Sequence, residues 1–155
     1  MADLITWSDD LSIGVQEIDE QHKVLVSLLN ELHSAVYEHH GSEACNMILN
    51  RLIEYTRIHF TTEESVMRLL LYPEFEHHKM EHDALTNQVI KFQTRLVSGQ
   101  TSMSFQLLHF LKVWLTKHIQ ESDRRCGAYL LERGVAASWA PHVEETMKKK
   151  WWKLW

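Results

Sequence analysis

The chain of 155 residues is long enough for one domain, and its 45% hydrophobic and 24% charged residues are typical of a folded globular protein. A net charge of −5 argues against general nucleic-acid binding, and no apolar run approaches the roughly 18 residues of a membrane-spanning helix. The first residues lack the pattern of a signal peptide, and the two distant cysteines exclude a disulfide scaffold, so we expect a cytoplasmic protein.

Only five glycines and two prolines interrupt the chain, and between these interruptions apolar residues recur at steps of three and four. This spacing predicts four helices, which cover approximately residues 18–36, 48–70, 78–96 and 108–122. Short connections favour antiparallel neighbours, so the predicted fold is an all-α, up-down-up-down antiparallel four-helix bundle with an extended N-terminal arm and a C-terminal extension. We expect the bundle to occupy residues 1–135 and a basic, tryptophan-rich tail to occupy residues 136–155.

Histidines and carboxylates occupy positions in the apolar stripes where a buried polar side chain is costly. At ~1.5 Å per helical residue, seven of them lie between about 22 and 31 Å from the bundle end that holds the loops near Gly41 and Gly99. They are His22, His59, Glu63, His78, His82, His118 and Asp123. A single such histidine is more often a hydrogen-bonded core residue, but scattered core histidines are not expected to share one slab of a bundle.

Asp123 fits this pattern least well. It follows His118 by five residues, which is about 140° around an ideal helix. It would have to reach in from the flank of the stripe, or a local π-bulge would have to turn it inward. The regular stripe favours Ser122 instead, and the nearby acidic residues Glu64 and Glu121 are expected to be solvated.

Imidazoles and carboxylates without a thiolate suit iron, manganese or zinc. Seven ligands exceed the need of a single ion, whereas two ions bridged by both carboxylates would divide the five imidazoles three and two. That division leaves one ion a ligand short. An open position on a redox metal, enclosed by apolar side chains, is a place for a small molecule.

Four segments resemble the hemerythrins, and in particular the single-domain bacterial hemerythrins. They are Trp7 with Gly14–His22 (GVQEIDEQH), His59–Glu64 (HFTTEE), Tyr72-Pro73 with His78–His82 (HKMEH), and Trp114–Ile119 (WLTKHI) with Asp123. The resemblance covers about residues 4–135. It implies reversible O2 binding at two non-haem iron ions with an oxo or hydroxo bridge, in a protein that transports, stores or delivers oxygen and is not an enzyme.

The resemblance also implies a role for each matching residue. The ligands of a six-coordinate iron would be His78, His82 and His118. The ligands of a five-coordinate iron, with room for O2, would be His22 and His59. The bridging carboxylates would be Glu63 and Asp123. The lining of the O2 pocket would be Phe60, Trp114, Leu115 and Ile119, which would serve equally well as ordinary bundle core.

Other interpretations stay open at this point. His78–His82 also matches the H-x-x-E-H signature of zinc proteases, although that leaves the other candidate ligands unexplained. A ferritin-like oxidase would need Glu-x-x-His on two helices, and only Glu74–His77 fits. An oxygen or redox sensor, or a diiron oxidase or peroxidase-type enzyme, would use the same family site, but a sensor usually needs an output domain for which this length leaves no room.

The resemblance fades after Gly134, and residues 141–155 hold four lysines against two glutamates, together with three tryptophans. This segment carries a charge of +2 within the total of −5, which leaves −7 on the rest of the chain. If it is helical, an apolar stripe lies beside the lysines, a pattern that suits a membrane interface or an anionic partner. One hypothesis is that the tail tethers an oxygen carrier to a membrane-associated consumer at the inner membrane face. The alternative is that its tryptophans dock on the bundle or on a second copy.

Overall fold

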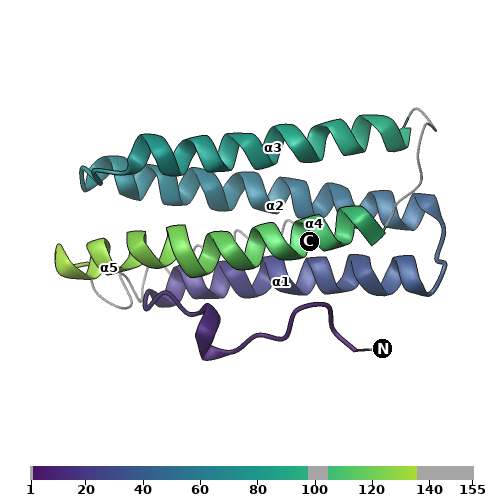
Figure 1. The fold of residues 1–155 in the computed structure, drawn as a ribbon, viewed down its shortest axis with the longest axis horizontal. Coiled ribbons are helices and arrows are strands. Elements are labelled where there is room, and N and C mark those ends of the chain that lie inside the picture. Colours follow the sequence, from purple (N-terminus) through teal and green to yellow (C-terminus); the bar gives the residue numbers. More distant parts are fainter. Residues whose placement is uncertain (1, 98–104, 136–155) are drawn as a thin grey trace.

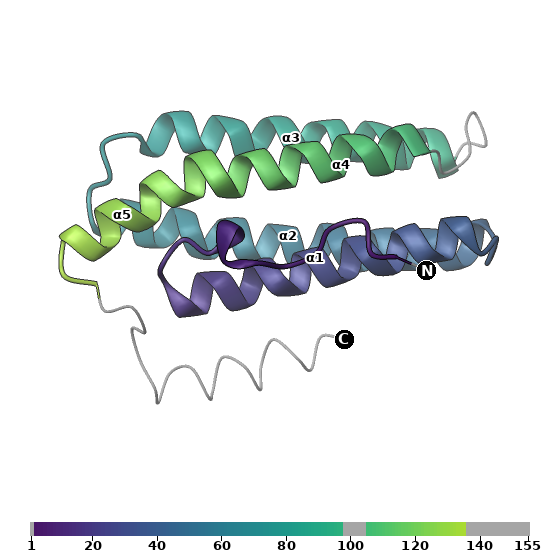
Figure 2. The ribbon, with the colours of Figure 1, turned by 60° about the horizontal axis from the view of Figure 1, so that its bottom comes forward.

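The computed structural model describes residues 2–97 and 105–135, which form a bundle of four long helices. The helices are α1 (Gln16–Tyr37), α2 (Ser42–Leu69), α3 (Phe75–Val97) and α4 (Phe105–His118). The chain continues from α4 through a π-helical turn, η2 (Ile119–Asp123), into α5 (Arg124–Glu132). Figures 1 and 2 show the four long helices running along the same axis, with α5 extending α4 at one end. The predicted all-α four-helix bundle is confirmed.

The apolar stripes of the helices form the core. On α1, Ile18, Leu25, Leu29 and Leu32 are all at most 2% exposed, and they recur at steps of three, four and seven residues, as expected for one helix face. Burying each such side chain stabilises the fold by about 1.5–3 kcal/mol. The same stripe carries His22, which is fully buried. The packing that holds the bundle together therefore also fixes the position of this imidazole.

The N-terminal arm is extended, apart from a 3₁₀ turn, η1 (Asp9–Leu11), and it lies along α1 (Figure 2). Both backbone polar groups of Ile5 bond to the side-chain amide of Asn30, each at 2.9 Å. Within α5, Gly127 lets the backbone of the arm approach closely, because a Cβ atom at this position would lie 2.6 Å from the carbonyl oxygen of Ile13. The arm thus closes the bundle beside the end that holds η2.

Three sequence predictions concern parts of the chain outside the described residues. They are the tail at residues 136–155, its boundary with the bundle, and the connection around Gly99. None of the helices within residues 2–97 and 105–135 is both long enough and apolar enough to cross a membrane.

Candidate metal centre

The seven side chains identified from the sequence lie together inside the bundle, and none is more than 5% exposed. Their nitrogen and oxygen atoms form two overlapping groups, and within each group one atom per residue lies within 4.8 Å of the others. The three-histidine group contains His78, His82, His118, Glu63 and Asp123. The two-histidine group contains His22, His59, Glu63 and Asp123. The two carboxylates therefore belong to both groups.

Each carboxylate turns one oxygen toward each group. Oδ2 of Asp123 lies 3.0 Å from Nε2 of His22, whereas its Oδ1 lies 2.9 Å from Nε2 of His78. Oε1 of Glu63 lies 3.0 Å from Nε2 of His59, whereas its Oε2 lies 3.3 Å from Nε2 of His82. This is the orientation that a carboxylate bridging two metal ions needs.

The π-helical turn η2 explains why Asp123 faces the cluster. A π-turn accommodates about one extra residue compared with an α-helical turn, so a residue five positions on returns to the same face. Asp123 thereby comes to lie with Oδ1 3.1 Å from Nε2 of His118. Of the two routes considered from the sequence, the structure has the π-bulge. Ser122, which the regular stripe favours, is also buried, but its hydroxyl donates to Glu81 at 2.6 Å.

The imidazoles and carboxylates of the cluster shift one another's pKa values. Burial by itself would lower the pKa of His22, but close contact with Asp123 and Glu63 outweighs it and raises the pKa to about 9. The pKa of His78 is raised to about 10 by the same two carboxylates, again against burial. Burial would raise the pKa values of Glu63 and Asp123, yet contact with the imidazoles holds both well below their usual range. Both carboxylates are therefore ionised and ready to act as ligands.

Several of these buried atoms make no hydrogen bond of good geometry. They are both carboxylate oxygens of Glu63 and of Asp123, both ring nitrogens of His22, and Nε2 of His78. Buried polar groups are normally hydrogen-bonded, and a cluster of exceptions needs an explanation. Metal ions held by the two groups would give a partner to the four carboxylate oxygens and to Nε2 of His22 and of His78. The residues present therefore fit a pair of metal ions.

Three of the five imidazoles are oriented by side chains from other helices. Nδ1 of His59 lies 2.6 Å from Oε1 of Gln21, and Nδ1 of His82 lies 2.9 Å from Oε2 of Glu64. Nδ1 of His118 lies 2.8 Å from Oε2 of Glu81. Such contacts fix the ring orientation and the tautomer of a ligand histidine.

These orienting residues were missed from the sequence. The expectation that Glu64 is solvated is wrong, because its side chain is only 14% exposed and bonds to His82. Glu121, by contrast, is exposed as expected. The one available signal was that Gln21 and Glu81 each precede a clustered histidine in the sequence.

The ferritin-like alternative does not assemble a site. Its only motif, Glu74–His77, starts before α3, and the side chain of His77 is 67% exposed. His77 instead places its Nδ1 3.2 Å from Glu81. The H-x-x-E-H glutamate, Glu81, is bonded to His118 and Ser122, so it acts as a partner of the cluster.

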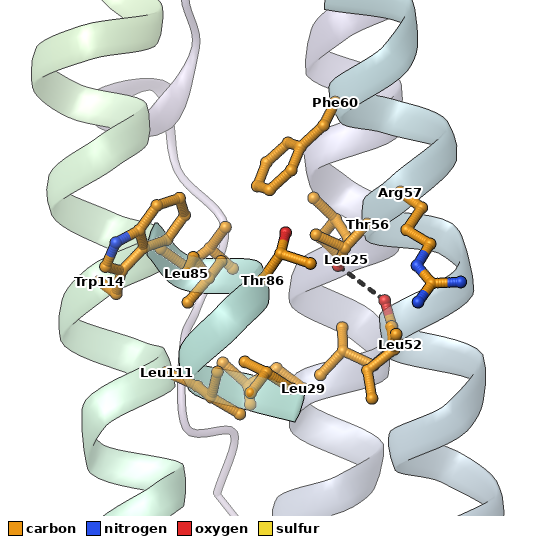
Figure 3. A pocket seen from close by; sticks show the side chains of 13 residues that line it. Leu25, Leu29, Leu52, Thr56, Arg57, Phe60, Leu85, Thr86, Leu111 and Trp114 are labelled. Carbon is orange, nitrogen blue, oxygen red and sulfur yellow. Dashed lines mark hydrogen bonds between the residues drawn. The ribbon is translucent and has the colours of Figure 1, made fainter. Parts of the chain in front are cut away.

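A cavity of about 50 Å³ lies between the helices, and Figure 3 shows the side chains around it. The ring of Phe60 lines it and stacks on His82, with ring centroids 3.7 Å apart. Trp114 also lines it and stacks on His118 at 4.4 Å. Two walls of the cavity are therefore in contact with imidazoles of the three-histidine group.

The cavity wall is mostly apolar, and its polar side chains are those of Arg57 and two threonines. Its two threonines bond to backbone of their own helices: the hydroxyl of Thr56 donates to the carbonyl of Leu52 at 2.6 Å, and that of Thr86 to the carbonyl of His82 at 2.9 Å. Leu115 is part of the lining, as are Phe60 and Trp114. Ile119, the fourth residue expected around an O2 pocket, is fully buried but is not part of this cavity lining.

Comparison with known proteins gives consistent matches. The family model described as the hemerythrin HHE cation binding domain matches residues 13–130. The bacteriohemerythrin of Pseudomonas aeruginosa is 35% identical over 125 residues, which is 79% of this chain and 78% of that protein. The bacteriohemerythrin of Methylococcus capsulatus is 31% identical over 128 residues, which is 82% of this chain and 97% of that protein. The crystal structure of a wild-type hemerythrin is 30% identical, with a TM-score of 0.78 over 82% of this chain and 98% of that chain.

Proposed function

Because the chain belongs to the hemerythrin family, we propose that it binds O2 reversibly at two non-haem iron ions, for oxygen transport, storage or delivery. One observation carries this proposal: the buried cluster divides into three and two histidines that share both carboxylates. Such a set suits two ions with bridging ligands and leaves one ion with an open position. When bound, the irons would supply the redox electrons and the coordination position that O2 needs.

In this proposal each residue keeps the role that its motif implies. One ion would be held by His78, His82 and His118. The other would be held by His22 and His59. Glu63 and Asp123 would bridge the two ions, together with an oxo or hydroxo bridge. The support for this division is that each carboxylate turns one oxygen to each group.

The chain's own contribution is to keep the site dry. Phe60, Trp114 and Leu115 are proposed to line the approach of O2, with Ile119 filling the core behind them. A cavity of about 50 Å³ is about a third of the ~150 Å³ that accommodates benzene, so it suits guests the size of a diatomic gas. Apart from Arg57 the walls are mostly apolar, and both threonine hydroxyls donate to backbone carbonyls of their own helices, so the lining offers few hydrogen-bond donors to a small apolar guest.

The test is metal analysis followed by absorption spectroscopy of the full chain. Two irons per chain and a charge-transfer band that appears with O2 and disappears on its removal would support the proposal. His78→Ala should abolish the band, whereas alanine at the exposed His109 should leave it unchanged.

Other outcomes would overturn it. Sustained O2 consumption with an electron donor would favour an oxidase or peroxidase-type enzyme. One zinc ion with peptidase activity would favour the zinc-protease interpretation.

A further inference from the structure

The outer ring nitrogens of the clustered histidines have unequal partners. In the three-histidine group, His82 bonds to the carboxylate of Glu64 and His118 bonds to the carboxylate of Glu81. In the two-histidine group, His59 bonds to the neutral amide of Gln21. Nδ1 of His22 is buried and makes no hydrogen bond to any described residue. Among the described residues, a carboxylate therefore contacts the outer nitrogen of two histidines in the three-histidine group, whereas none does so in the two-histidine group.

Glu81 is held in place by contacts with His118 and Ser122. The Ser122 hydroxyl donates to the same oxygen that contacts His118, at 2.6 Å. This serine belongs to the π-helical turn, so the turn that brings Asp123 into the cluster also anchors Glu81.

A carboxylate behind a ligand histidine increases the basicity of the imidazole. A more basic imidazole donates more electron density, which strengthens the bond to a cation and favours its higher oxidation state. An amide behind a histidine orients the ring without adding negative charge. The two metal positions are therefore inequivalent in charge as well as in their number of histidines.

We propose that Glu64 and Glu81 are positioning residues that make the three-histidine group the tighter metal position and the one that favours the more highly charged ion. This inference rests on the proposed function, since it assumes that both groups hold metal. It assigns a role to Gln21 as well: its neutral side chain keeps the two-histidine position weaker.

The test uses two nearly isosteric substitutions of opposite sign, Glu81→Gln and Gln21→Glu, in the full chain. Titration of the metal-free protein with Co²⁺ under argon measures two affinities without any O2 chemistry. Glu81→Gln should weaken the tighter step by tenfold to a hundredfold, the usual effect of losing such a partner. Gln21→Glu should strengthen the weaker step. In the iron-loaded protein, the midpoint potential should rise for Glu81→Gln and fall for Gln21→Glu.

A merely structural role predicts a different result, because either substitution would then disturb the packing and weaken binding. Weakening by both variants, or potentials that move in the same direction, would therefore overturn this inference. If circular dichroism shows that Glu81→Gln does not fold, Glu64→Gln provides the same test through His82. Failure of the wild-type chain to bind Co²⁺ and iron would overturn the proposed function instead, so the two failures are distinguishable.

Discussion

Replacing Phe60 with alanine should damage both the core and the metal centre. The ring of Phe60 is 6% exposed and lies between the cavity and His82, on which it stacks with an interplanar angle of 4°. Its removal joins a ring-sized void to the existing cavity of about 50 Å³. It also removes the ring that stacks on His82, while the contact of this imidazole with Glu64 remains.

The expected loss of stability is about 3–5 kcal/mol, the usual range for deleting a buried phenylalanine side chain. For a chain of this size that corresponds to a fall in Tm of about 10 °C. The matched control is Phe105→Ala on α4, where the ring is 57% exposed. That ring still contacts Tyr37, with centroids 5.0 Å apart, so the control should lose only about 1 kcal/mol.

The assay is urea unfolding of the metal-free protein, with and without saturating benzene. An apolar void of sufficient size stays dry and binds benzene, so benzene should restore part of the stability of Phe60→Ala and leave the wild type unchanged. Equal losses of stability for Phe60→Ala and Phe105→Ala, together with no benzene effect, would refute the assignment of Phe60 as the wall between cavity and metal centre.

Three further predictions concern the rest of the chain. The metal-free protein should be most stable near neutral pH, and unfolding measured as a function of pH would test this. The raised pKa of His22 stabilises the fold fully below pH about 6.5, and this contribution is lost as the pH rises through about 9. The lowered pKa of Glu63 stabilises the fold above the ordinary pKa range of a glutamate, and this contribution is lost on acidification. Gly127→Ala should cost about 1–3 kcal/mol, since the new Cβ would lie 2.6 Å from the Ile13 carbonyl oxygen, and chemical denaturation would detect it; an unchanged midpoint would contradict the close packing of the arm. Removal of residues 141–155 should reduce co-sedimentation with anionic liposomes, and equal sedimentation of both chains would remove the membrane hypothesis.

Helical height and face predict which five histidines belong to the candidate centre. His22, His59 and His118 lie on different helices, yet the rise per residue predicts that they share one height, and the apolar stripes predict that they face inward. The rise per residue and the position of the apolar stripe are both properties of a single helix. They hold in the structure because the helices are long and their connections are short.

Asp123 shows the limit of that reasoning. From the sequence, its five-residue step from His118 left two routes to the cluster, because a π-turn depends on a local change of backbone hydrogen bonding that no residue pattern here specifies. The contacts that orient the histidines could not be predicted from the sequence for a related reason. Gln21, Glu64 and Glu81 each bond to a histidine on a different helix, so their partners depend on how the helices are rotated against one another.

The sharing of Glu63 and Asp123 has a consequence for how the two metal positions work together. Four buried carboxylate oxygens face two groups, and two of the four lie on each side. An ion at one position alone would leave the carboxylate oxygens of the other side buried beside imidazoles. Those oxygens would then need protonated imidazoles as hydrogen-bond donors. Occupation of the first position therefore orients both carboxylates for the second, while its positive charge disfavours the protonated histidines across the bridge. The carboxylates behind the three-histidine group then decide which position is occupied first. Glu64 and Glu81 favour binding of the first ion there, whereas the neutral Gln21 leaves the two-histidine position to bind the second ion.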